Sequence, residues 1–237
     1  CRIWMPKIAS SDSPVPALLE YIPYRKRDMT RGGDGPKHSY FAGHGYASVR
    51  VDMAGAGDSF GVMRDEYARQ ELSDGKEIIA WRARQFWCNG KVGMFGISWG
   101  GFNSIQMAMR NPPALKAFVA LMATEYLYQE DVHYMDGIMH TDSWMMSNDL
   151  YNVLPGAPDF KMDEEWVRNR FNVEPSVYTY MRQQRDGAFW DRASARGQYE
   201  KIRVPGYHIG GWYDGYRNSL PRMLENVEAP VKAMIGP

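Results

Sequence analysis

The chain has 237 residues, 44% of them hydrophobic, and its 28 Lys and Arg residues balance 28 Asp and Glu residues. These totals suit a globular protein built on one large α/β domain, and the zero net charge argues against binding to nucleic acid or an anionic membrane. Two cysteines, Cys1 and Cys88, are too few for a disulfide framework or a four-ligand Cys/His zinc site, so we expect no metal. No apolar run approaches the roughly eighteen residues of a membrane span. We therefore expect a soluble protein without a membrane partner, with the cytoplasm favoured.

The N-terminal part of the sequence alternates strand-like segments with turn-rich connections. Strands are predicted at residues 2–5, 17–22 and 46–52. Residues 24–36 are polar and rich in glycine, which predicts a long loop at the active-site edge of a sheet, with the Arg25-Lys26-Arg27 run as a solvated cluster. The glycines at 55, 57 and 61 miss the spacing of a dinucleotide-binding loop by one residue. We therefore expect no nucleotide or other cofactor.

A serine flanked by glycines is the central motif of the chain. Residues 65–86 predict an amphipathic helix that leads into a short apolar strand at 92–95. The run Gly96-Ile97-Ser98-Trp99-Gly100 follows, and a helical pattern leaves it. This order is typical of a nucleophile elbow, in which small residues let the backbone turn sharply and expose the serine hydroxyl. Ser98 is the predicted nucleophile, and the alternative is an ordinary Gly-rich turn.

The second half of the chain adds an insertion to the sheet. A strand is predicted at 115–122, and strands at 202–209 and 231–235 flank a helix at 218–225. Residues 124–198 show no strand pattern and carry scattered Met and aromatic residues, which predicts a helical insertion. We thus expect an α/β fold with a mostly parallel sheet and three parts: a first core part at 1–123, a helical cap insertion at 124–198 and a second core part at 199–237.

A nucleophilic serine requires a histidine base and a carboxylate that orients it. Asp214 fits the acid, because it follows a predicted strand in a Gly-flanked turn, although an aspartate there also suits a turn or a helix cap. All five histidines precede Asp214, so none stands where the base of an α/β-hydrolase is expected, and His208 is interpreted as a packed residue. The amide of Trp99 and the hydroxyl of Tyr24 are candidate oxyanion donors, but Tyr24 equally suits a residue that covers the sheet end.

Several stretches together resemble the cocaine esterase and X-Pro dipeptidyl-peptidase group of α/β-hydrolases, which includes the α-amino acid ester hydrolases. The matching stretches are 21–28, 45–59, 87–101 and the Gly-Gly-Trp-Tyr-Asp-Gly run at 210–215. The resemblance implies Ser98 as nucleophile, Asp214 as triad acid, and Tyr24 with the Trp99 amide as oxyanion donors. It also implies a helical cap, which agrees with the insertion.

The resemblance also implies parts that the sequence does not contain. In this group the triad histidine comes a few residues after a segment like Ile235-Gly236-Pro237, and a jelly-roll β-domain follows. We therefore expect an internal segment of a longer hydrolase, truncated at both ends, with the histidine within about ten residues beyond Pro237. The 237 residues alone are expected to turn over esters poorly.

The substrate pocket is predicted only in outline. Members of the group that bind a free α-amino group use carboxylates near the cap, a role open to Glu130, Asp131 and Asp136, although a solvated acidic cluster is an equal alternative. The candidate pocket residues are Glu130, Asp131, His133, Trp144, Trp190 and Trp212. His140 is a further histidine of the insertion that is placed to line a pocket.

The predicted function is a serine hydrolase that cleaves small ester or peptide substrates, X-Pro dipeptidyl bonds included, through an acyl-enzyme on Ser98. One alternative is a catalytically silent binding or scaffold protein with a hydrolase fold, which the missing histidine favours. A closer alternative is a prolyl-oligopeptidase-like peptidase, against which the Gly-Trp-Tyr-Asp turn and the early Pro-Tyr pair argue. The sequence predicts no oligomeric state.

Overall fold

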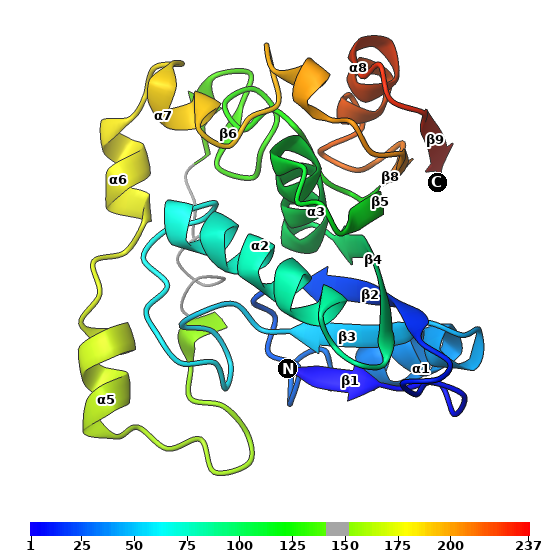
Figure 1. Cartoon of the computed structure of the whole chain (residues 1–237). Helices are drawn as coiled ribbons and strands as arrows, with labels where there is room; N and C mark the ends of the chain where they lie inside the picture. The colour runs from blue at the N-terminus through cyan, green and yellow to red at the C-terminus, as the bar shows by residue number, and fades with distance from the viewer. Residues whose placement is uncertain (141–151) are drawn as a thin grey trace.

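A seven-stranded sheet forms the centre of the molecule (Figure 1). The computed structural model describes residues 1–140 and 152–237. The sheet has the order β1-β3-β2-β4-β5-β8-β9, in which β1 pairs antiparallel with β3 and every other neighbouring pair is parallel. Its strands are β1 (Arg2–Trp4), β2 (Val15–Tyr21), β3 (Ala47–Val51), β4 (Cys88–Ile97), β5 (Leu115–Leu121), β8 (Gly206–Gly211) and β9 (Val231–Gly236). The predicted α/β fold with a mostly parallel sheet is confirmed.

Helices cover both faces of this sheet. They are α1 (Arg31–Gly43), α2 (Arg69–Ala83), α3 (Trp99–Arg110) and α8 (Ser219–Asn226). In Figure 1, α2 and α3 lie in front of the sheet and α1 lies behind it. A Cβ atom added to Gly75 of α2 would lie 2.9 Å from the sulfur of Met107, so glycine allows α2 to pack closely on α3. None of the helices in the described parts of the chain combines the length and the apolar composition that crossing a lipid bilayer requires.

The carboxyl ends of the three central strands meet at one edge of the sheet. The Ser98 amide, just after β4, donates to the Leu121 carbonyl at the end of β5 over 2.9 Å. The Met122 amide, just after β5, donates to the Ile209 carbonyl of β8 over 2.8 Å. Side chains that follow these strands therefore lie side by side, at the edge where ligands bind in open parallel sheets.

Helix α1 contradicts the predicted loop at 24–36. Three glycines and a proline in its first two turns disfavour a helix in isolation. Two buried side chains of this helix, Asp34 and His38, form polar contacts with Glu20 and Arg50 of the neighbouring strands. These tertiary contacts outweigh the weak local propensity of the segment, which is the usual outcome for short helices in folded proteins.

The predicted solvated cluster at residues 25–27 is also wrong for two of its three members. Arg25 is 4% exposed, and its guanidinium pairs with Asp28 over 2.5 Å. Lys26 is 5% exposed, and its ammonium pairs with Asp52 over 3.1 Å and also with Asp58. Only Arg27 is solvent-exposed. The nearby Asp28 compensates the burial of the Arg25 charge, and Asp52 and Asp58 from a more distant part of the chain compensate that of Lys26.

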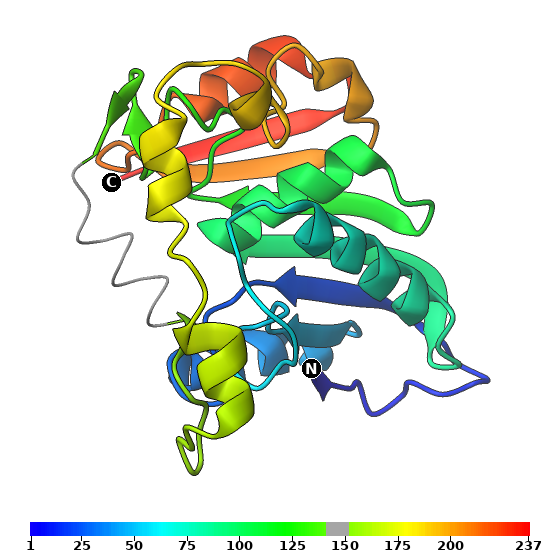
Figure 2. The same ribbon diagram turned by 90° about the vertical axis from the view of Figure 1, so that its left-hand side faces the viewer.

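The segment between β5 and β8 was predicted to contain no strand, and this was wrong, because it begins with a two-stranded hairpin. Its elements are β6 (Tyr134–Met135), β7 (Ile138–Met139), α5 (Glu164–Trp166), the π-helix η1 (Val167–Phe171), α6 (Val177–Arg182) and α7 (Ala188–Asp191), and the 3₁₀-helix η2 (Tyr199–Lys201) returns the chain to β8. Each element is too short for the periodic pattern that a sequence reveals. Figure 2 shows α5 and α6 on the side towards which the central strands point. We call residues 124–198 the inserted segment.

Candidate active site

Ser98 occupies a strained turn at the carboxyl end of β4. Its backbone has φ 51° and ψ −123°, a conformation that non-glycine residues rarely adopt. The turn is tight because β4 and α3 nearly touch: a Cβ atom on Gly96 would lie 2.6 Å from the backbone of Gly100. The glycines on either side of Ser98 are therefore required by geometry, and the serine side chain is left partly exposed above the sheet.

Two hydrogen-bond donors converge beside the Ser98 hydroxyl. The Tyr24 hydroxyl, in the loop after β2, donates to Ser98 Oγ over 3.2 Å. It also interacts with the backbone amide of Trp99. Burial is the largest cause that raises the pKa of Tyr24, so this hydroxyl remains a proton donor at neutral pH. The two predicted oxyanion donors thus lie next to each other and next to the candidate nucleophile.

Glu71 of α2 holds the side chain of Trp99 by a hydrogen bond. The Trp99 indole N–H donates to Glu71 Oε1 over 2.7 Å, and both side chains are buried. Burial raises the pKa of Glu71 to about 8. The sequence did not single out Glu71, because it lies 27 residues before Ser98 in an amphipathic helix where a glutamate is ordinary.

Asp214 lies in the turn after β8, as predicted. Its Oδ2 atom is buried and has no hydrogen-bond partner among the residues that the structure describes. Burial is the largest cause that raises the pKa of this carboxyl, while the amides of Gly215 and Tyr216 favour its charged form. Asp214 borders a cavity of about 270 Å³, which is lined by Asp131, Val132, Met135, His140, Asp214, Gly215 and Tyr216. The Asp214 carboxyl therefore combines an oxygen that has no partner among the described residues with a position at the edge of a cavity.

None of the five histidines, all of which lie in the described parts of the chain, forms a hydrogen bond to Ser98. His208 is 1% exposed on β8 and packs edge-on against the ring of Phe118 at 5.4 Å. Burial lowers the pKa of His208 to about 4, so the ring is neutral at physiological pH. This agrees with the prediction of a packed residue.

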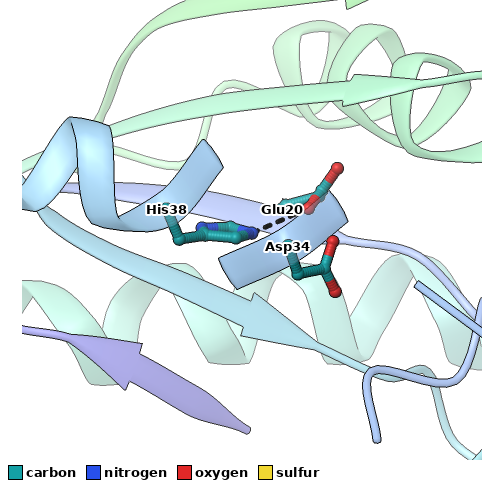
Figure 3. A group of neighbouring side chains, drawn as sticks. All are labelled: Glu20, Asp34 and His38. Carbon is teal, nitrogen blue, oxygen red and sulfur yellow. Dashed lines mark hydrogen bonds and ion pairs between the residues drawn. The ribbon is translucent and has the colours of Figure 1, made fainter. Parts of the chain in front are cut away.

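A serine–histidine–carboxylate arrangement that does not include Ser98 lies on the α1 side of the sheet. His38 places Nδ1 at 2.7 Å from Ser48 Oγ and Nε2 at 2.9 Å from Glu20 Oε2, and Figure 3 shows the His38–Glu20 contact. Ser48 and His38 are both fully buried. A substrate cannot reach Ser48, so this arrangement holds α1 on the sheet, and Ser98 is the serine at the open edge.

The structure brings two predicted pocket residues, Asp131 and His133, together with Glu66 of the core. His133 Nε2 lies 2.5 Å from Glu66 Oε2 and 4.0 Å from Asp131 Oδ2. All three side chains are at least nine-tenths buried. Burial raises the pKa of Asp131 to about 7, whereas His133 favours its charged form. The alternative of a solvated acidic cluster is therefore wrong for Asp131.

The other predicted pocket residues are not gathered at this cluster. Glu130 is buried and paired with the guanidinium of Arg222 over 2.5 Å, so it too is not solvated. Trp190 is 2% exposed and packs among aromatic rings of the inserted segment. Trp212 is 61% exposed in the turn that carries Asp214. Trp144 lies outside the described residues.

A mainly apolar cavity begins at Trp99. It has a volume of about 120 Å³ and is lined by Met63, Arg64, Asp65, Trp99, Val153, Arg170, Phe171, Val173, Glu174, Pro175, Ser176 and Val177. Most of these residues belong to the inserted segment. The cavity could not be predicted from the sequence, because its lining residues come together only when the inserted segment lies over the sheet edge.

The parallel sheet, the strained serine between β4 and α3, and the Tyr24–Ser98 hydrogen bond define a protein with the α/β-hydrolase fold, in which Ser98 occupies the strand-to-helix turn where that fold carries a nucleophile elbow. Residues 1–237 match the family model described as X-Pro dipeptidyl-peptidase (S15 family), and the chain belongs to this family. The resemblance inferred from the sequence motifs is thus confirmed.

Individual relatives agree with this assignment. The chain is 27% identical over 256 residues to a Mycobacterium bovis protein named as a serine esterase, with 98% of this chain and 39% of the relative covered. It is 34% identical over 120 residues to the cocaine esterase of a Rhodococcus species, covering 50% of this chain and 21% of that enzyme. The solved structure of a CocE/NonD family hydrolase from Staphylococcus aureus matches with a TM-score of 0.76 at 20% identity, covering 99% of this chain and 42% of that one.

The chain spans about two fifths of the length of the first of these relatives and of the solved structure. The matched region contains the elbow and the Asp214 turn, so the candidate site can be described within it. The activity, substrates and partners of the whole protein are treated as proposals.

Proposed function

We propose that the full-length protein is a serine hydrolase that cleaves ester or amide bonds through an acyl-enzyme on Ser98. The observation that carries this proposal is the strained backbone of Ser98 together with the Tyr24 hydroxyl 3.2 Å from its Oγ. A strained, partly exposed serine beside convergent donors is the arrangement that acyl transfer requires. It favours an enzyme over a silent scaffold. Membership of the S15 family favours this reading over a prolyl-oligopeptidase-like peptidase.

In the proposed reaction, Ser98 Oγ attacks the carbonyl carbon of the substrate while its proton passes to a histidine base. The carbonyl oxygen gains negative charge, which the Tyr24 hydroxyl and the Trp99 amide stabilise. The tetrahedral intermediate then expels the alcohol or amine, which takes the proton from the histidine. Water attacks the acyl-enzyme in the same way and releases the acid, and Ser98 recovers its proton.

Asp214 is the proposed acid of the triad, and a histidine beyond Pro237 is the proposed base. The Trp212 amide, two residues before Asp214, donates to the Gly236 carbonyl at the end of β9 over 2.7 Å. A segment that continues from β9 in the full-length protein would therefore start next to Asp214. Asp214 also borders the cavity of about 270 Å³, which has room for an imidazole ring.

The proposed substrates are small esters or peptides, X-Pro dipeptides among them. The mainly apolar cavity is lined by Trp99, the residue after the candidate nucleophile, and suits an apolar part of such a substrate. The inserted segment would then act as a cap that completes the substrate pocket.

Covalent labelling of the full-length protein with a fluorophosphonate tests the nucleophile. We expect labelling of the wild type and its loss in Ser98→Ala, since the probe reacts with an activated serine. Ser48→Ala is the matched control, because Ser48 is also hydrogen-bonded to a histidine but is fully buried. Labelling that persists in a folded Ser98→Ala variant would place the nucleophile elsewhere, and a folded wild type that takes no label would favour the scaffold alternative.

A further inference from the structure

Two buried clusters in this protein have the same donor types. Each contains two carboxylates and one histidine whose donor atoms all lie within 4.8 Å of one another. The first consists of Glu20, Asp34 and His38 (Figure 3). The second consists of Glu66, Asp131 and His133 and lies beside the candidate active site. We call them the α1 cluster and the junction cluster.

The α1 cluster is already neutralised by fixed cations. The Lys37 ammonium lies 2.7 Å from Glu20 and 3.2 Å from Asp34. The Arg50 guanidinium lies 3.3 Å from Asp34, and His38 is engaged by Ser48 on its second nitrogen. Two basic side chains balance two carboxylates, so this cluster has neither the charge nor the vacant donors to attract a metal ion.

The junction cluster has a different charge balance. His133 is the basic side chain that the described ion pairs place against the Glu66 and Asp131 carboxylates. The neighbouring Arg192 pairs with Asp65 over 2.7 Å and reaches only the main-chain oxygen of Glu66. Residues 141–151 contain no Lys, Arg or His. The described ion pairs thus place one imidazole against two buried carboxylates, in a site where uncompensated charge is costly.

Asp131 also points to a missing ligand. The residue is 1% exposed, and its Oδ2 atom has no hydrogen-bond partner among the described residues. This oxygen faces His133, and Asp131 borders the cavity of about 270 Å³ beside Asp214. A buried acceptor that has no partner among the described residues and lies beside the other donors of its cluster is the feature that the α1 cluster lacks.

We propose that Glu66, Asp131 and His133 bind a divalent metal ion, with zinc favoured by the mixed nitrogen and oxygen donors. Zinc–ligand bonds of about 2.1 Å place neighbouring tetrahedral donors about 3.4 Å apart. His133 Nε2 now lies 2.5 Å from Glu66 Oε2 and 4.0 Å from Asp131 Oδ2. To reach this spacing, each of the two distances would change by less than about 1 Å. A water molecule would complete a four-coordinate site.

Such an ion would join two parts of the chain. Glu66 belongs to the core, in the loop before α2, whereas Asp131 and His133 belong to the inserted segment. A metal ion that binds the folded protein and not the unfolded chain stabilises the fold by an amount that grows with the logarithm of its concentration divided by its Kd. The inference does not depend on hydrolase activity.

Isothermal titration of the EDTA-treated full-length protein with ZnCl2 tests the proposal. We expect one ion per chain, and we expect Glu66→Gln and Asp131→Asn each to weaken binding at least about tenfold, since each removes a charged ligand. Glu20→Gln in the α1 cluster is the matched control and is expected to bind as the wild type does. A wild type that binds no zinc, or equal losses in all three variants, would overturn the proposal.

A measurement on the wild type covers the case in which the variants fail to fold. Titration with Co2+ is expected to give the intense visible absorption of a tetrahedral site, and a weak spectrum like that of the aqueous ion would contradict the assignment.

Kinetics with an amino acid ester test the competing ligand of the junction cluster, which is the ammonium group of a substrate. If Asp131→Asn raises KM for phenylalanine methyl ester while no metal binds, the junction cluster takes an ammonium group and the metal proposal is wrong.

Discussion

The substitution Glu71→Gln is expected to stabilise the protein at neutral pH. Glu71 Oε1 accepts a hydrogen bond from the Trp99 indole, and Oε2 is buried without a partner among the described residues. Burial raises the pKa of this carboxyl from 4.5 to about 8. The carboxyl therefore keeps its proton up to about pH 8 in the folded protein, but loses it near pH 4.5 in the unfolded chain. Glutamine resembles the protonated form and does not titrate.

The sign and size of the effect follow from this pKa difference. Because the folded pKa is raised, stability is fully present below about pH 4.5 and falls as the pH rises to about 8. Each pH unit in that window lowers the free energy of unfolding by about 1.4 kcal/mol. The accumulated cost is on the order of 3 kcal/mol at pH 7. The variant should thus equal the wild type in acid and exceed it by up to about 3 kcal/mol at neutral pH.

Urea unfolding of both proteins at about pH 5, 6, 7 and 8 measures this difference directly. Glu77→Gln, an exposed position on the same helix, is the matched control and should show almost no pH-dependent change. A constant difference between Glu71→Gln and the wild type at all four pH values would refute the reasoning, because it would mean that Glu71 titrates alike in the folded and unfolded states.

Two further predictions concern the elbow. In the full-length protein, Tyr24→Phe should lower kcat for p-nitrophenyl esters about 10²- to 10³-fold with little change in KM, since a lost oxyanion donor acts mainly in the transition state; an unchanged kcat would remove Tyr24 from the oxyanion site. Gly96→Ala should lower the free energy of unfolding by about 2 kcal/mol or more, because its Cβ would lie 2.6 Å from the Gly100 backbone. Gly33→Ala has open space around its Cβ and should be neutral or slightly stabilising, so equal effects in urea unfolding would contradict the steric argument.

The elbow and the central sheet were predictable because their causes are local. The apolar run of β4, the glycines at 96 and 100 and the helical pattern of α3 are neighbours in sequence, and each expresses a short-range steric or periodic requirement. Buried parallel strands also appear in a sequence as apolar runs, so the number of strands and their approximate positions along the chain could be predicted. The position of Asp214 followed from its place after a strand.

Helix α1 was not predictable for the opposite reason. Its first turns carry residues with poor helix propensity, and its stability depends on Glu20 and Arg50, which come from two different strands. No window of sequence contains all these partners. The burial of Lys26 has the same origin, because the carboxylates that pair with it lie 26 and 32 residues away. Polar burial is a property of the assembled fold.

The same limit applies to the candidate site. Ser98, Tyr24 and Trp99 could be proposed from motifs, whereas Glu66 and Glu71 could not, because glutamates in and before an amphipathic helix are usually solvated. Only the structure shows that Glu71 supports the indole of Trp99 and that Glu66 meets two residues of the inserted segment. For such residues the informative observation is the burial of an ionisable side chain beside the candidate site.

The negative charge of the junction cluster bears directly on the candidate nucleophile. Glu66 and Asp131 both act to raise the pKa of Tyr24, so their field reaches the proposed oxyanion site. An oxyanion that forms there is opposed by the same field. A positive ligand in the junction cluster would cancel this opposition, whether it is a resident metal ion or a charged group of the substrate. If the proposed hydrolase reaction takes place, occupation of the junction cluster by such a ligand would favour formation of the oxyanion, so the identity of the ligand is the central question about this site.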